Sequence, residues 1–169
     1  PDSVTSIGEG VFYGCSSLTE IVVGENNPEY GSLDGVLFNK GQTALIRCPG
    51  GKSGTYIVPD GVTEIGMGAF LKCSNLTSVI IPDSVTEIGM GAFGGCSSLT
   101  SVIIPDSITE IGLGAFYKCV KLTDVYFKGN APKLPNGNAF FEPSVIYYKP
   151  GTTGWRNPWD RRPTKEWVE

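Results

Sequence analysis

A phrase of 23 residues recurs along this chain and constrains what the chain can fold into. It occurs three times in succession, beginning at Pro59, Pro82 and Pro105, and an earlier copy begins at Pro1. One cysteine holds the same slot in every copy: Cys15, Cys73, Cys96 and Cys119. A fixed period between about 20 and 50 residues is typical of a solenoid, in which successive units stack as coils. The sequence therefore predicts one elongated stack.

A single copy of the phrase is not expected to fold alone. Full burial of a large apolar side chain contributes roughly 1.5 to 3 kcal/mol, whereas ordering the backbone of each residue costs about 1 to 2 kcal/mol. The copy that begins at Pro82 offers a short set of residues for burial: Val85, Ile88, Ala92, Phe93, Cys96, Leu99, Val102 and Ile104. Neighbouring coils must therefore cover one another's apolar edges and pair their strands.

Within one coil the sequence predicts two short strands and a short helical turn. Alternate positions of residues 99–104 are apolar, which predicts a strand of the main sheet that ends at Pro105. Residues 108–111 predict a second short strand on the opposite side of the coil. The predicted helical turn places three apolar side chains on one face: Ala115, Phe116 and Cys119. The expected fold class is a β-rich solenoid that winds as a right-handed superhelix.

The phrase IPDSVTEIGMGAFGGCSSLTSVIIP, at residues 81–105, resembles the bacterial BspA-type leucine-rich repeat. The resemblance is close over residues 1–23 and 59–127, and it extends to the phrase DGVLFNKGQTALIRCP and the tail YYKPGTTGWRNPW. It implies a leucine-rich-repeat solenoid of a bacterial cell-surface or secreted protein. The chain departs from the better-known leucine-rich repeat at Ser84 and Ser107, where an asparagine ladder would need Asn or Cys.

We expect residues 1–169 to form a single domain, since the length falls in the single-domain range. The expected units are regular repeats at 1–23, 59–81, 82–104 and 105–127, a variant coil with a hairpin insertion at 24–58, and a degenerate coil with a C-terminal cap at 128–169. The chain begins in mid-pattern at Pro1, without an initiator Met or an apolar leader. This phase predicts further repeats or a cap upstream.

Two irregular segments each leave two interpretations open. In the variant coil, residues 36–38 and 44–46 flank the turn-forming residues 39–42. The predicted hairpin is either a binding protrusion or a tolerated loop insertion. The tail contains all three tryptophans of the chain: Trp155, Trp159 and Trp167. They either cover the apolar end of the stack as a cap or present an aromatic platform to a sugar or a peptide.

Charge and hydropathy argue against some partners. The chain has 13 Lys and Arg against 17 Asp and Glu, and the repeats lack the basic patch that nucleic acid requires. No apolar stretch reaches the length of about 18 residues that a membrane-spanning helix needs. We therefore expect neither nucleic-acid binding nor membrane insertion of this chain. The family resemblance implies an extracellular or cell-surface location, and we expect a monomer.

No catalytic, metal or cofactor site is expected. The chain has no histidine, which removes the Ser-His and Cys-His nucleophile arrangements, and it has no C-x-x-C pair for zinc. The repeat cysteines are expected to be buried thiols. Carboxylates form two predicted columns, one of Asp60, Asp83 and Asp106 and one of Glu64, Glu87 and Glu110. A solvated structural role for them is favoured over weak calcium binding or catalysis.

The remaining functional candidate is the outer face of the main sheet. If Val79, Val102 and Val125 point inward, their neighbours must form outward columns. The first column contains Glu20, Ser78, Ser101 and Asp124, and the second contains Val22, Ile80, Ile103 and Tyr126. A contiguous exposed apolar strip often marks a contact surface, although β-branched residues also simply favour strands.

These observations lead to the hypothesis of a non-catalytic, protein-binding solenoid. Its partner would be a protein of a host or bacterial surface, and the family resemblance implies a role in adhesion to host or neighbouring cells. The alternative is a carbohydrate-binding accessory module of a larger secreted protein, with Trp155 and Trp159 in the ligand site. A third class, an enzyme, would need a deep pocket with perturbed carboxylates.

Overall fold

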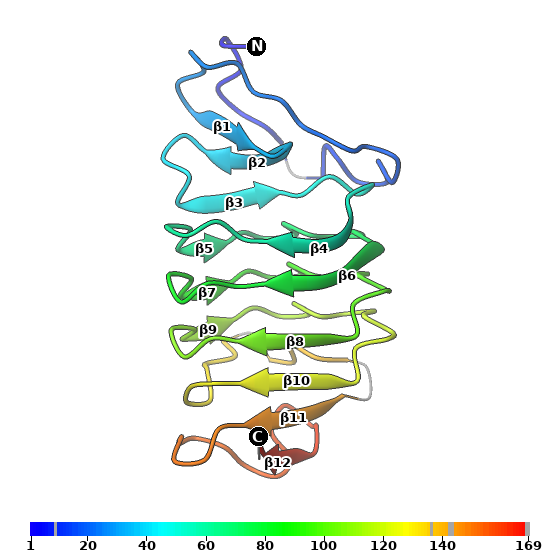
Figure 1. Cartoon of the computed structure of the whole chain (residues 1–169), viewed down its shortest axis with the longest axis vertical. Coiled ribbons are helices and arrows are strands. Elements are labelled where there is room, and N and C mark those ends of the chain that lie inside the picture. Colours follow the sequence, from blue (N-terminus) through cyan, green and yellow to red (C-terminus); the bar gives the residue numbers. More distant parts are fainter. Residues whose placement is uncertain (9, 136, 142–143, 168–169) are drawn as a thin grey trace.

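The computed structural model describes residues 1–8, 10–135, 137–141 and 144–167. Its strands stack along one axis as successive turns of a β-solenoid, from the N-terminal coil to the C-terminal end (Figure 1). The strands are β1 (Tyr30–Leu33), β2 (Val36–Asn39), β3 (Ala44–Arg47), β4 (Ser53–Ile57), β5 (Glu64–Ile65), β6 (Asn75–Ile80), β7 (Glu87–Ile88), β8 (Ser101–Ile104), β9 (Glu110–Ile111), β10 (Asp124–Phe127), β11 (Val145–Tyr148) and β12 (Thr164–Glu166). The predicted fold class is confirmed.

Each regular coil contributes one strand to each of two sides of the solenoid. On one side, β5, β7 and β9 continue a six-stranded sheet of order β1-β2-β3-β5-β7-β9. On the other side, the front strands in Figure 1 are β4 and β6, which form a two-stranded sheet, and β8, β10, β11 and β12, which form a four-stranded one. Residues one period apart pair directly, as Ser101 does with Asp124 and Val102 with Val125. The 23-residue period of the sequence thus sets the register in which neighbouring strands pair.

Four phenylalanines form a continuous stack through the solenoid. Neighbouring ring centroids of Phe70, Phe93, Phe116 and Phe140 are 4.9, 5.0 and 4.8 Å apart, and adjacent ring planes differ by 5°. All four side chains are fully buried. The stack arises because each repeat places its phenylalanine at the same phase of the coil, so that every ring covers the next.

The predicted helical turn is wrong. In residues 112–119 alternate amides, those of Ala115, Tyr117 and Cys119, donate to carbonyl groups three residues earlier, as in a series of tight turns. Gly114 and Lys118 have positive φ angles of 62° and 58°, which a right-handed helix does not allow. The amide of Phe116 donates to the carbonyl of Ala139 in the next coil, at 2.9 Å. Stacking therefore takes up donors that a helix would use, and no helix occurs in the residues that the structure describes.

Residues 24–58 interrupt the regular coil. β1, β2 and β3 follow one another as antiparallel strands. Asp34 and Gly35 between β1 and β2 have φ angles of 50° and 72°, which suit a tight two-residue hairpin turn. β3 then returns to the parallel stack, where Leu45 pairs with Ile65 of β5. This coil therefore carries no counterpart of the Gly-x-Gly-Ala-Phe turn that the regular coils place at residues 66–70, 89–93 and 112–116.

The cysteine slot of the repeats is buried, with one exception. The Sγ of Cys96 donates to the carbonyl of Phe70 in the preceding coil, at 3.2 Å. Cys15 is exposed, so its predicted burial is wrong. The variant coil that follows it lacks the turn against which residues 10–15 would stack. The buried cysteines are Cys48, Cys73, Cys96 and Cys119.

Aromatic and charged side chains of the C-terminal segment cover the last coil. Trp159 is only 9% exposed, and its ring lies 6.4 Å from that of Phe140. The Asp160 carboxylate accepts hydrogen bonds from the amides of Ala139 and Phe140, both at 2.9 Å. Arg162 Nη2 donates to the carbonyl of Phe140 at 3.1 Å. Burial raises the pKa of the Asp160 carboxyl, and the two amide hydrogen bonds oppose that rise. Side chains here bond to backbone groups that would otherwise pair with a further coil.

Candidate functional site

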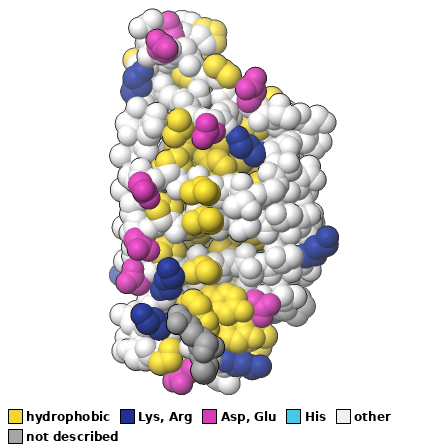
Figure 2. All heavy atoms as spheres, viewed as in Figure 1, with side chains coloured by type: hydrophobic (Ala, Val, Ile, Leu, Met, Phe, Trp, Pro, Cys, Tyr) yellow, Lys and Arg dark blue, Asp and Glu magenta, His cyan; other side chains and the backbone are white. Residues whose placement is uncertain are grey.

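The outward side chains of the front strands form an apolar row, which we call the outer column. It begins with Ile57 on β4, Ile80 on β6 and Ile103 on β8, which are 64%, 50% and 46% exposed. Their neighbours Val79 and Val102 are buried. Because side chains of a strand alternate between its two faces, an inward valine places the next isoleucine outward. Figure 2 shows hydrophobic side chains as a stripe along this face, broader toward the C-terminal end.

Two tyrosines extend the outer column. Tyr126 on β10 pairs with Ile103 of β8 and with Tyr147 of β11. The two tyrosine rings stack with centroids 4.8 Å apart, and the ring of Trp167 lies 5.2 Å from that of Tyr126. Desolvation, together with the nearby Asp124 carboxylate, raises the pKa of the Tyr147 phenol. The broad end of the stripe is thus an aromatic cluster with an acidic neighbour.

A shallow hollow of about 180 Å³ lies between β6 and β8 on this face. Ser78, Ser101, Ile80 and Ile103 line it, and Lys128 adds a cation. β6 and β8 belong to separate sheets, so the hollow follows a seam in the front face. The structure therefore brings four of the residues predicted from the sequence together around one depression.

The other members of the two predicted columns do not line this hollow. Asp124 is half-buried and pairs with Ser101 in the register of β8 and β10. Val22 is exposed, but it lies in the N-terminal coil, outside the strands that the structure describes. Ile57 instead pairs with Ile80 and extends the column. Sequence reasoning missed Ile57, although the phrase YIVP around it repeats the strand end one period before Ile80.

Trp155 and Trp159 lie apart from the outer column. Tyr148 follows the outward Tyr147 on β11 and packs against the core. Trp155 stacks on Tyr148, with ring centroids 5.3 Å apart, and lies 5.1 Å from the ring of Trp159. Trp159 is itself part of the core. The two tryptophans therefore pack on the inward side of β11, opposite the outward Tyr147.

The glutamate column lies on the other sheet. Glu64, Glu87 and Glu110 pair in register across β5, β7 and β9. Within the described part of the chain, no group of three or more His, Cys, Asp or Glu side chains is placed to hold a metal ion. The same residues include no helix that is long and apolar enough to cross a membrane.

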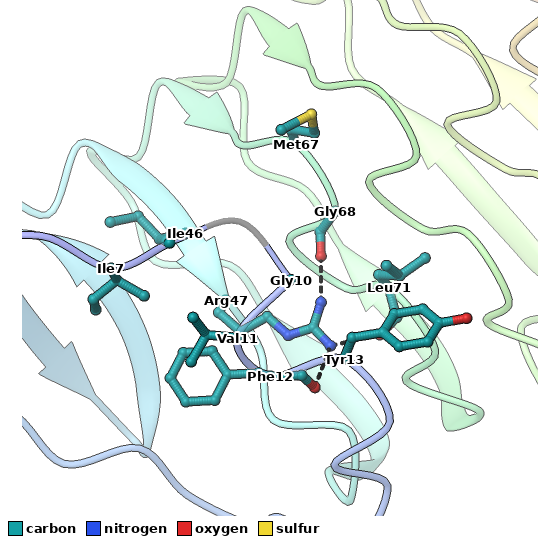
Figure 3. A pocket seen from close by; sticks show the side chains of 11 residues that line it. Ile7, Gly10, Val11, Phe12, Tyr13, Ile46, Arg47, Met67, Gly68 and Leu71 are labelled. Carbon is teal, nitrogen blue, oxygen red and sulfur yellow. Dashed lines mark hydrogen bonds between the residues drawn. The ribbon is translucent and has the colours of Figure 1, made fainter.

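A second and larger hollow, of about 380 Å³, lies between the N-terminal coil and the coil that begins at Pro59 (Figure 3). Arg47 of β3 is one of the residues that line it. Arg47 Nη1 donates to the carbonyl of Gly68 at 2.7 Å, and Nη2 donates to the carbonyls of Leu71 at 2.9 Å and Phe12 at 3.4 Å. Most of the other lining is apolar and includes Ile7, Val11, Tyr13, Ile46 and Met67. This hollow was not predicted from the sequence, because it lies where the repeat is interrupted.

The stacked coils, the buried phenylalanine stack and the exposed sheet face are those of a leucine-rich-repeat solenoid. In this class of protein the coils form a scaffold whose sheet face is open to solvent. The chain belongs to the BspA type leucine rich repeat family, whose model matches residues 1–39 and 52–147 in six copies. This family is a repeat scaffold and is not known as an enzyme family. The resemblance read from the repeat phrase is thereby confirmed.

Solved structures of bacterial proteins share the fold. A leucine-rich repeat protein from Eubacterium ventriosum is 29% identical, with a TM-score of 0.75 over 88% of this chain and 41% of that chain. The pneumococcal vaccine antigen PcpA is 25% identical, with a TM-score of 0.67 over 79% of this chain and 40% of that one. A leucine rich cell surface protein from Faecalibacterium prausnitzii is 24% identical, with a TM-score of 0.56 over 91% of this chain and 47% of that one. The chain thus spans less than half of each of these proteins. A comparison with curated proteins gives no match.

Proposed function

We propose that this chain is a non-catalytic protein-binding solenoid of a bacterial cell-surface or secreted protein, and that its outer column contacts a protein of a host or neighbouring cell in adhesion. The observation that carries the proposal is the row of half-exposed isoleucines beside the seam hollow. A soluble protein rarely exposes a contiguous apolar strip that has no contact function. The family membership and the cell-surface description of one solved relative support the proposed location.

The chemistry of the face suits a protein partner. Ile80 and Ile103 offer branched apolar area, while Ser78 and Ser101 beside them offer small hydrogen-bonding groups. This combination of an apolar centre with a polar rim is the usual anatomy of a protein interface. Lys128 places a single cation at the hollow, which favours a partner with a carboxylate opposite it.

Replacing Ile80 and Ile103 together with threonine tests the proposal. Threonine keeps the β-branched shape, so the strands are expected to remain and the melting temperature to stay within a few degrees. Binding to a partner isolated from host-cell or neighbouring-cell surface extracts is expected to weaken roughly tenfold or more, because central apolar anchors dominate interfaces. Surface plasmon resonance with the immobilised chain measures the change.

A matched double variant, Met90→Thr with Val120→Thr, removes two other exposed apolar side chains away from the outer column. It is expected to bind as the unaltered chain does. Equal binding by both double variants would place the contact elsewhere, at the hairpin around Lys40 or at the tail.

The aromatic cluster of Tyr126, Tyr147 and Trp167 favours a second candidate, a carbohydrate-binding module. Sugars stack on open ring faces, but Tyr126 and Tyr147 already cover one face of each other. A glycan array with the Tyr147→Ala variant discriminates between the two functions, because glycan binding that disappears with Tyr147 would favour the carbohydrate module. Trp159 is unsuitable for this test because its removal would open the core.

A further inference from the structure

The larger hollow of Figure 3 results from the interrupted repeat. In regular coils the amides of Phe70 and Phe93 donate to carbonyls of the next coil at 2.7 Å, so that consecutive Gly-x-Gly-Ala-Phe turns stack without a gap. The variant coil has no such turn, and it reaches the following coil here through the amide of Cys48, which donates to Ala69 at 2.7 Å. The space that a turn would fill stays open between residues 10–13 and 66–71.

Arg47 takes over the polar role of the missing turn. Its guanidinium donates to carbonyls of Gly68, Leu71 and Phe12, which belong to the coils on both sides of the gap (Figure 3). These carbonyls therefore keep a hydrogen-bond donor when water leaves the hollow. The carbonyls of Gly68 and Phe12 also accept the amides of Leu71 and Cys15, at 2.9 and 3.3 Å, so the Leu71 carbonyl is the one that depends on Arg47. An apolar group that fills the hollow therefore leaves none of the three carbonyls without a donor, and loss of a donor is the usual penalty for drying a backbone-lined site.

Two described cationic side chains, those of Lys72 and Arg47, lie at the hollow. Lys72 Nζ lies 4.1 Å from the ring centroid of Tyr13, and its hydrogen bond and charge lower the pKa of the Tyr13 phenol. Arg47 adds a second positive charge, and no carboxylate is present among the described residues that line the hollow. A ligand with an apolar body and an anionic end complements it.

We propose that this hollow is a second binding site, which accepts an aromatic side chain of a protein partner with a neighbouring carboxylate directed toward Lys72. The volume of about 380 Å³ lies within the range of roughly 300 to 1,000 Å³ that is typical of ligand pockets. Aromatic anchors seated in pockets are the commonest strong points of protein interfaces, and the Met67 thioether offers a favourable contact with a ring. The site goes beyond the proposed function, because it lies on the turns that follow β5 and not on the outer column.

The chain supplies its own probe and control. It has 2 methionines: Met67 lines the hollow, and Met90 occupies the same repeat position one coil further on, with 50% and 47% exposure. With ¹³C-methyl methionine in the protein, N-acetyl-L-phenylalanine is titrated as an aromatic carboxylate. The Met67 methyl signal is expected to shift and saturate with a dissociation constant on the order of 1 mM. The Met90 signal is expected to stay in place.

Two further experiments distinguish the contribution of the ligand's carboxylate from that of the shape of the hollow. N-acetyl-L-phenylalaninamide lacks the carboxylate and is expected to bind roughly two- to fivefold more weakly, a difference that Lys72→Gln removes. Val11→Trp is expected to fill the hollow and abolish the saturable shift. Val120→Trp alters a similarly exposed valine elsewhere and is expected to leave the shift unchanged.

Three results would overturn the proposal. The first is that Met67 and Met90 shift alike without saturation, which means nonspecific contact. The second is that the acid and the amide bind equally well, which removes the carboxylate from the ligand. The third is that the Met67 signal of the protein alone moves on dilution while sedimentation shows a dimer, which means that a second copy of the chain fills the hollow.

Discussion

Replacement of Phe93 with alanine is expected to lower the free energy of unfolding by roughly 3 to 5 kcal/mol. Phe93 is fully buried, and its ring is stacked between Phe70 and Phe116 with centroids 4.9 and 5.0 Å away. Its loss leaves a cavity in the middle of the ladder and removes one covering ring from each neighbouring coil. Urea unfolding followed by circular dichroism measures the change, with a much lower midpoint expected for the variant.

Thr86→Ala in the same coil is the control. Thr86 is exposed, and its Oγ1 donates to the carbonyl of Thr63 at 3.2 Å. Loss of one exposed hydrogen bond is expected to cost about 0.5 to 1 kcal/mol. Equal midpoints for the two variants would contradict the ladder as the main source of stability.

The repeat made the fold predictable because stacking depends on phase. Once the phrase recurs every 23 residues, equivalent residues of adjacent coils must meet, as Val102 meets Val125. The strand alternation then separates inward from outward positions, as for the buried Val79 beside the exposed Ile80. Both inferences need only local spacing, which the sequence contains.

The prediction of a helical turn was wrong for a reason that the spacing of apolar residues cannot reveal. Apolar residues at i, i+1 and i+4 fit a helical turn and a series of tight turns equally well. Contacts between coils decide the matter, since the amide of Phe116 bonds to Ala139 of the next coil and Gly114 and Lys118 adopt positive φ angles. The exposure of Cys15 has a similar origin, because the following coil lacks the Gly-x-Gly-Ala-Phe turn that would cover it.

Candidate site residues were placed well only where the repeat is regular. Ile80 and Ile103 follow from alternation, whereas Trp159 lies in a segment with no repeat to indicate its direction, and the structure buries it. The role of Arg47 had no signal either. A single arginine in an interrupted coil gives no spacing from which to infer a partner, and its three carbonyl acceptors come from segments more than 20 residues away.

Replacement of Arg47 with methionine is expected to lower the free energy of unfolding by roughly 2 to 4 kcal/mol, because hydrogen bonds to a charged group contribute about 1.5 to 3 kcal/mol each. Methionine keeps much of the length of the side chain but leaves the carbonyl of Leu71 without the guanidinium donor beside an apolar hollow, while the carbonyl of Gly68 keeps only the amide of Leu71, at 2.9 Å. Lysine is expected to recover only part of the loss, since a single ammonium lacks the planar fork that reaches several carbonyls at once. Urea unfolding measures the global cost.

The damage is also expected to be local. Arg47 ties residues 1–23 to the coil that begins at Pro59, because Phe12 and Gly68 share its guanidinium. Limited proteolysis of Arg47→Met is therefore expected to cleave within residues 1–23 several times faster than in the unaltered chain. Arg156→Met, which removes an exposed guanidinium in the tail, serves as the control and is expected to change neither the midpoint nor the cleavage rate. If Arg47→Met matched that control in both measurements, the N-terminal coil would be held by its backbone and apolar contacts alone, and Arg47 would not replace the missing turn.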